Sequence, residues 1–150
     1  MEENKYYTPE IEELHIGFEY EILDLASTEY GKSPEKAIWN KEELKTSDLY
    51  SSYKQDSYIE TLASYLKSEN LRVKYLDRED IESLGWEHDE YAYDKSDPYS
   101  LIIFDKEGIK LHYDVEDHTV TIHRKDDYMI RDIIIKNKSE LKKVLKMIGV

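Results

Sequence analysis

The chain has 150 residues, of which 37% are charged, and its formal net charge is −13 at pH 7. It contains no cysteine, which excludes disulfides, thiolate nucleophiles and sulfur-ligated metal sites. It has no apolar run of about 18 residues, and it begins with the acidic segment MEENKYYTPE. We therefore expect neither a membrane span nor a signal peptide, and we place the protein in the cytoplasm.

The negative charge is spread unevenly along the chain. Residues 1–35 carry ten acids and two lysines, whereas residues 124–150 carry eight bases and four acids. Such a surface repels phosphates over most of its area, so we expect no direct binding of nucleic acid or of anionic membranes. The acidic surface either serves solubility alone or meets a basic partner.

The first predicted elements form a hairpin followed by a helix. Apolar and polar residues alternate from Leu14 to Ile22, which predicts a strand, and Ala37 to Trp39 predicts its returning partner after a loop over residues 24–35. Residues 45–56 show no periodicity and predict a mobile connection. A helix over about 58–68 should follow, with Ser57 and Glu60 as a capping box.

Residues 71–86 predict a strand, a short helix and the end of that helix in direct succession. Alternation in LRVKY predicts a strand with an apolar and a basic face. Asp77 should cap a short helix over 78–84, and Gly85 should end it in the left-handed conformation. Trp86 should then fold back onto Ile81.

The next segment predicts antiparallel strands. Tyr91 and Tyr93 belong to one strand, and 99–104 to a second that a loop over 105–108 joins to a third. The apolar residues of 109–113 and 119–123 share one face only if two pairs of residues lie opposite each other: Tyr113 with Val120, and Leu111 with Ile122. This register makes His112 and His123 diagonal neighbours.

The C-terminal part predicts a strand and a helix. The strand covers about 128–135, and its end, Ile133 to Ile135, should lie deep in the sheet because it is apolar on both faces. Asn137 should cap a helix over about 138–148, which Gly149 ends. Together the elements predict a single α+β domain over residues 1–150, with a mostly antiparallel sheet of six or seven strands, two longer helices (58–68 and 138–148) and a short one (78–84).

Motifs for catalysis are lacking. The five glycines stand apart, and no P-loop or nucleophile elbow is present. We assign no catalytic residue and no cofactor. His112 and His123, with Asp114 nearby, are weak candidates for a metal site, because diagonal cross-strand neighbours lie about 7–8 Å apart. They could equally be polar residues of a solvated sheet face.

Two hypotheses concern small ligands and aromatic residues. Arg72 and Lys74, with Trp86, Tyr91 and Tyr93, could line a site for a small anion or nucleotide, or the two bases could simply neutralise acids of residues 77–90. The chain also has 14 tyrosines, which suit either a binding surface or a half-buried sheet.

Three blocks of the sequence are TPEIEELHIGFEYE, RVKYLDREDIESLGW and IKNKSELKKVLKMIG. In this order they resemble a family of short uncharacterised proteins of bacteria and their phages. The resemblance covers about a third of the chain and implies a phage or mobile-element context, but it brings no activity, cofactor or site residue. Residues 24–57 and 88–128 fall outside the shared pattern.

The sequence therefore predicts a non-enzymatic binding protein whose acidic, tyrosine-rich surface engages or inhibits a host protein with a basic surface. Two alternatives stay open. One is a sponge that captures a small molecule or nucleotide signal. The other is an acidic mimic of DNA, although the mixed charge of residues 36–76 argues against it.

Overall fold

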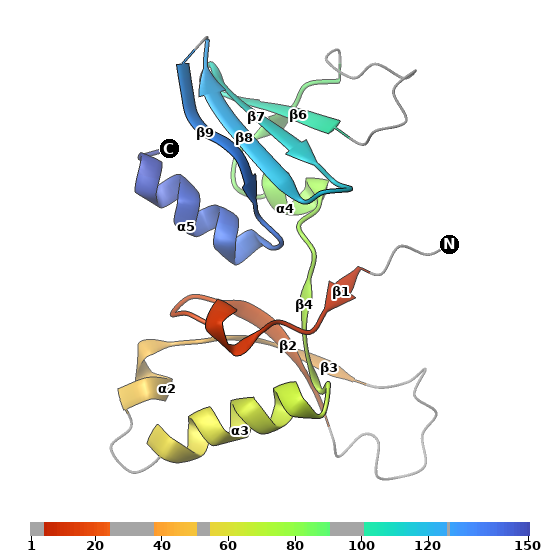
Figure 1. Cartoon of the computed structure of the whole chain (residues 1–150), viewed down its shortest axis with the longest axis vertical. Coiled ribbons are helices and arrows are strands. Elements are labelled where there is room, and N and C mark those ends of the chain that lie inside the picture. The colour runs from red at the N-terminus through yellow and green to blue at the C-terminus, as the bar shows by residue number, and fades with distance from the viewer. Residues whose placement is uncertain (1–4, 25–37, 51–54, 91–100, 126) are drawn as a thin grey trace. The chain divides into compact units, whose positions relative to one another are not determined.

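The computed structural model describes residues 5–24, 38–50, 55–90, 101–125 and 127–150, and the fold below refers to these. The chain forms two compact units, Met1–Lys74 and Tyr75–Val150, each with its own antiparallel sheet (Figure 1). The α+β class is confirmed. The single sheet of six or seven strands is replaced by two sheets, of four and five strands. Whether the two units fold as one domain over residues 1–150 stays a prediction.

The first unit is a four-stranded sheet in the order β1-β4-β2-β3, accompanied by two α-helices and a short 3-10 helix. Its buried core combines residues in or next to the strands with Leu62 of a helix: Phe18, Tyr20, Leu44, Leu62, Leu71 and Val73. The elements are β1 (Tyr6–Tyr7), η1 (Ile11–Glu13), β2 (Glu19–Leu23), β3 (Trp39–Glu43), α2 (Thr46–Tyr50), α3 (Gln55–Lys67) and β4 (Leu71–Lys74).

The first predicted strand is shorter than expected. It begins at Glu19 instead of Leu14, because Gly17 adopts a left-handed φ of 84° and breaks the extended backbone. Ile16, which precedes this turn, is 48% exposed, whereas Phe18, which follows it, is buried. The predicted hairpin is present, because β3 pairs with β2, but β3 begins at Trp39, where the predicted returning strand ends. Most of the loop over 24–35 lies outside the described residues.

The predicted connection over 45–56 is wrong in part, because it contains α2 and the first residues of α3. Helix α3 begins at Gln55, so Ser57 lies inside the helix instead of capping it. The helix ends at Lys67, one residue before the expected end.

The second unit is a five-stranded sheet in the order β5-β6-β7-β8-β9, with helices α4 and α5. The core contains apolar residues of the central strands together with Ile81, Trp86, Leu141 and Leu145, so α4 and α5 both pack on one face, called the inner face below. The elements are α4 (Arg78–Glu82), β5 (Glu87–His88), β6 (Leu101–Lys106), β7 (Ile109–Asp114), β8 (Thr119–Arg124), β9 (Asp127–Ile134) and α5 (Lys138–Ile148).

The N-caps of both helices in the second unit and the end of α5 at Gly149 are confirmed. Helix α4 is shorter than the predicted 78–84, because it ends at Glu82 with Ser83 as its C-cap, two residues before Gly85. The Asp77 side chain accepts a hydrogen bond from the Asp80 backbone N–H, and Asn137 accepts one from Glu140. Gly85 and Gly149 take the left-handed conformation, with φ of 84° and 74°. The backbone there needs a residue without a Cβ to avoid strain.

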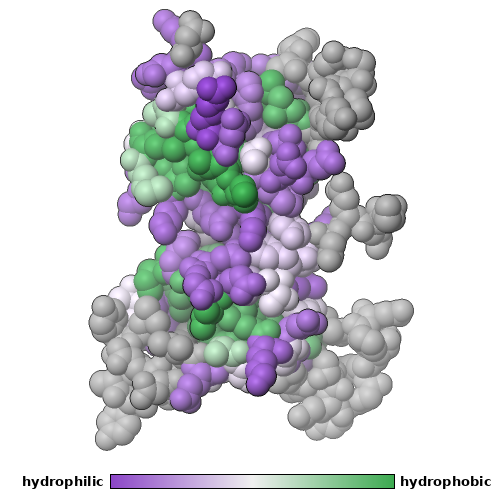
Figure 2. Space-filling model, in the orientation of Figure 1, coloured by the Kyte–Doolittle hydropathy of each residue, from purple (hydrophilic) through white to green (hydrophobic). Residues whose placement is uncertain are grey.

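The last strand differs from its prediction. Strand β9 lies at the edge of the sheet, and Ile134 is 67% exposed instead of deep inside. Only Ile135, just past the strand, is buried. Figure 2 shows apolar side chains reaching the surface over β9 and α5, where Met147 is also 69% exposed.

Candidate functional site

The face of the five-stranded sheet opposite the core, called the outer face below, carries a group of polar side chains. Along β7 and β8, Leu111, Tyr113, Val120 and Ile122 are fully buried on the inner face. The residues between them are therefore on the outer face, because side chains alternate along a strand. On these two strands they are Lys110, His112, Asp114, Thr119, Thr121 and His123.

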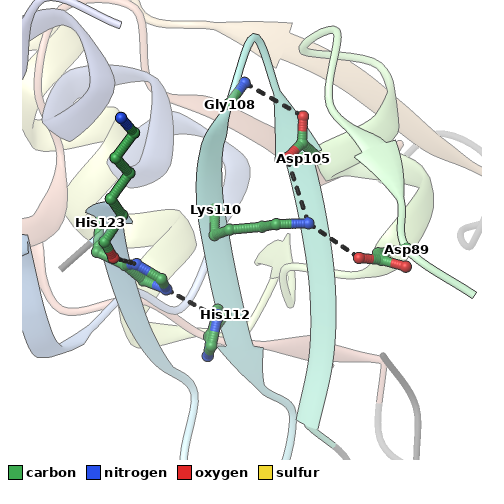
Figure 3. Close-up of polar contacts among 7 residues, drawn as sticks. Asp89, Asp105, Gly108, Lys110, His112 and His123 are labelled. Carbon is green, nitrogen blue, oxygen red and sulfur yellow. Dashed lines mark hydrogen bonds and ion pairs between the residues drawn. The ribbon is translucent and has the colours of Figure 1, made fainter. Parts of the chain in front are cut away.

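His112 and His123 are brought together as predicted. Tyr113 pairs with Val120 and Leu111 with Ile122, so the register inferred from the sequence is confirmed. The two histidine rings meet edge to face with their centroids 4.8 Å apart, and their Nε2 atoms are 3.0 Å apart. Figure 3 shows the two side chains pointing toward each other from neighbouring strands.

The hydrogen bonds define which nitrogen of the pair carries a proton. His123 Nδ1 lies 2.8 Å from the Lys125 carbonyl oxygen. A carbonyl oxygen can only accept, so Nδ1 must donate, and in the neutral ring Nε2 is then an acceptor. His112 Nε2–H therefore donates to His123 Nε2. Burial, followed by the proximity of His123 and Lys110, lowers the pKa of His112 below 6.5, which favours its neutral form.

Beside the histidines, Lys110 is held by two carboxylates. Its Nζ lies 2.9 Å from Asp89 and 3.2 Å from Asp105, and Figure 3 shows it reaching across β6 toward them. The hydrogen bond to Asp89 is the main reason that the pKa of Lys110 is raised above 10.5. Asp105 also accepts a hydrogen bond from the Gly108 backbone N–H, in the turn that joins β6 to β7.

A pocket of about 280 Å³ opens on this face next to the histidines. Both histidines line it, together with Asp114 and the β9 residues Tyr128, Arg131 and Asp132. Thr121 donates a hydrogen bond to the Asp132 carboxylate at 2.9 Å and accepts one from the Asp132 backbone N–H. This exchange fixes the bulge of β9, where Asp132 has a left-handed φ of 48°.

Large apolar side chains surround the polar centre of the outer face. Leu101 is paired with Asp114, Tyr128 with His123 and Ile134 with Thr119, which places all three on the outer face. Their exposed fractions are 38%, 55% and 67%. They are three of the seven exposed large hydrophobic residues of the described chain, so the outer face gathers apolar surface as well as charge.

A closed metal site is not formed by these residues alone. Within the described parts of the chain, no three or more histidine, aspartate or glutamate side chains are grouped to hold an ion. The histidine pair thus offers two ligands, and Asp114 does not form a three-ligand group with them.

Arg72, the centre of the other predicted site, lies on the sheet of the first unit. Its guanidinium contacts Glu21 Oε2 at 2.8 Å and stacks between the rings of Tyr6 and Trp39, at 3.8 and 3.9 Å from their centroids. The partner of Arg72 is therefore Glu21 on the neighbouring strand β2. Neither reading of the sequence, as an anion site or as a counter-charge to residues 77–90, anticipated this pair.

The other residues of that predicted site are divided. Lys74 lies on β4 with Arg72, whereas Trp86 belongs to the second unit, where it is 2% exposed and part of the core. Its predicted neighbour Ile81 is in the same core. Tyr91 and Tyr93 lie outside the described residues. The small-ligand site built from these five residues stays a prediction.

Tyr128 and Arg131 were missed by the sequence reasoning. Tyr128 lies opposite His123 on the outer face, whereas Ile130 lies opposite Ile122 on the inner face, because the register of β9 shifts between them. Alternation along the sequence of β9 therefore could not place Tyr128. The bulge at Asp132 had no signal in the sequence either, because Asp132 is not a glycine and its left-handed backbone depends on the contact with Thr121.

The comparisons with known proteins add no relative. No protein-family model matches the chain, and no curated protein or solved structure matches it significantly.

Among the described helices, none is long and apolar enough to cross a membrane.

Proposed function

We propose that the protein acts by binding, and that it engages a partner protein through the outer face of its five-stranded sheet. The observation that carries this proposal is the grouping of Leu101, Tyr128 and Ile134, all exposed, around an ordered polar centre on one face. Protein interfaces combine apolar and aromatic anchors with polar groups in the same way, and tyrosine and arginine are enriched in them.

The polar centre supports the proposal because its side chains are already held in place. Lys110 is fixed by two carboxylates, His112 by His123, and Asp132 by Thr121. Side chains that are ordered before binding lose less conformational entropy on association, which favours affinity.

Charge suggests the nature of the partner. The net charge of −13 favours encounter with a basic surface, and Asp114 and Asp132 place carboxylates beside the pocket. The resemblance to proteins of bacteria and their phages suggests a phage or mobile-element origin. The partner proposed is therefore a bacterial host protein with a basic surface.

The experiment compares two variants that each remove exposed apolar surface. Tyr128→Ala with Ile134→Ser changes the outer face, whereas Met147→Ser changes α5, whose core residues pack on the inner face. Ile134 and Met147 are almost equally exposed, at 67% and 69%, so Met147→Ser is the matched control for the Ile134→Ser change. Affinity purification from a bacterial lysate, at low and high salt, identifies the bound proteins by mass spectrometry.

We expect a protein that the wild type and Met147→Ser retain and that the outer-face variant loses. Its retention should fall at high salt, because screening weakens attraction between oppositely charged surfaces. Equal retention by all three proteins would exclude the outer face as the binding surface. Retention that does not change with salt would exclude a basic partner.

A further inference from the structure

The contact between His112 and His123 has a geometry that also suits a metal ion. The two residues lie on adjacent antiparallel strands and are both on the outer face, with their Nε2 atoms 3.0 Å apart. Imidazole nitrogens bind first-row transition metals at about 2.0–2.1 Å. Two nitrogens at this separation subtend an angle of about 95° at an ion placed at that distance from both.

This angle selects among metals. It is close to the 90° between neighbouring ligands of a square-planar or octahedral site, and it is smaller than the angle of about 109° in a tetrahedral zinc site. Copper(II) and nickel(II) favour tetragonal arrangements of nitrogen and oxygen ligands, and copper(II) binds most tightly in the usual order of divalent ions.

The surroundings of His123 fit the role of a ligand. Its Nδ1–H donates to the Lys125 carbonyl at 2.8 Å, which directs the lone pair of Nε2 toward His112. A metal-binding histidine usually donates its other ring proton to a carbonyl or carboxylate in this way, which fixes the ring and its tautomer.

We propose that His112 and His123 form a two-histidine site for copper(II) or nickel(II) on the outer face of the five-stranded sheet. The ion takes the position of the proton that His112 Nε2 donates to His123 Nε2. His112 stays neutral because its ring proton moves to Nδ1, so both histidines bind the ion as neutral imidazoles. Because the described residues offer no group of three ligands, water completes the coordination from the adjoining pocket of about 280 Å³. The site lies within the polar centre of the outer face, and binding of the ion does not require the proposed partner protein.

The test uses the full chain without a histidine tag, freed of metal by a chelator that is then removed. Calorimetric titration with copper(II), nickel(II) and zinc(II) measures affinity and stoichiometry. The variants are His112→Gln and His123→Gln, with His15→Gln as the control, because it removes a histidine of the first unit. Circular dichroism of each variant verifies that its secondary structure is kept.

We expect one equivalent of copper(II) per chain, bound more tightly than nickel(II) and zinc(II). Each of the two site variants should weaken binding by at least about tenfold, the effect that even outer-shell partners of a metal have, and His15→Gln should not. The electron paramagnetic resonance spectrum of the copper complex should show two coupled nitrogens, and one in each site variant. Unchanged affinity in both site variants, or the lack of saturable copper binding, would overturn the proposal.

Discussion

Tyr113 shows how one hydroxyl ties together distant parts of the second unit. The side chain is fully buried, and its hydroxyl donates to the Leu76 carbonyl at 2.8 Å and lies 3.2 Å from His118 Nδ1. Burial raises the pKa of Tyr113 above its usual value of 10, which keeps the hydroxyl protonated. His118 in turn stacks on Tyr75 with ring centroids 4.5 Å apart, so Tyr113 helps to hold residues 75–76 against the sheet.

Tyr113→Phe should lower the free energy of unfolding by about 1–3 kcal/mol, because it leaves the buried Leu76 carbonyl without this donor. Tyr128→Phe is the matched control, since Tyr128 is exposed and its change should stay within about 0.5 kcal/mol. Urea unfolding measures both. A Trp39→Phe background leaves the buried Trp86 as the reporter of the second unit. Equal stability of the two variants would show that the hydroxyl contributes nothing.

The contacts of single residues were predictable only where they follow from a strand register. His112 and His123 meet because the apolar faces of β7 and β8 allow one alignment, and this could be worked out from the alternation. The pair of Arg72 with Glu21 could not be predicted, because the two residues are 51 positions apart in the sequence and meet only if β4 lies beside β2. Local patterns contain no information on that strand order.

Among the elements, α5 and the β7–β8 pair match their predictions best. Each has a complete apolar period, and α5 also has caps at both ends. The predicted start of strand β2 is wrong because of Gly17, where the alternation of the sequence continues but the backbone turns. The predicted burial of the end of β9 is also wrong. An apolar run predicts burial, whereas the position of β9 at the sheet edge leaves Ile134 exposed. The alternation pattern does not report which strands lie at an edge.

The cap of α5 gives a direct test of this element. Asn137 is 2% exposed, and its side chain accepts from Glu140 N–H at 3.0 Å. Asn137→Ala should lower the free energy of unfolding by about 1 kcal/mol, within a range of about 0.5–2 kcal/mol. Lys142→Ala, on the exposed side of the same helix, is the control and should cost less. The difference between the two in thermal unfolding measures the cap, and its absence would contradict this role.

At the scale of the whole molecule, the predicted α+β class is confirmed, but the division of the strands into two sheets was not expected. Composition and element order predict an α+β protein, and the structure agrees. The division into two sheets with separate cores was not visible, because the link from Lys74 to Tyr75 has no glycine, proline or change in composition. Sequence patterns identify strands, but long-range packing decides how the strands are shared among sheets.

The outer face is likewise a property of the assembled sheet. Its apolar anchors, Leu101, Tyr128 and Ile134, come from the two strands on either side of β7 and β8, and they share a face only after those strands are aligned. The sequence indicated an acidic, tyrosine-rich binding surface in general terms. It did not identify this face, because the sequence does not distinguish exposed Tyr128 from tyrosines that belong to the cores, such as Tyr20 and Tyr113.

Site-specific photo-crosslinking tests binding through the outer face most directly. A photoreactive phenylalanine analogue replaces Tyr128 in one protein and Met147 in a second, and both are irradiated in a bacterial lysate at low salt. The proposed function predicts one defined adduct from position 128 and none from position 147, with the adduct lost when Ile134→Ser is added. An adduct of the same partner from position 147 alone would contradict it.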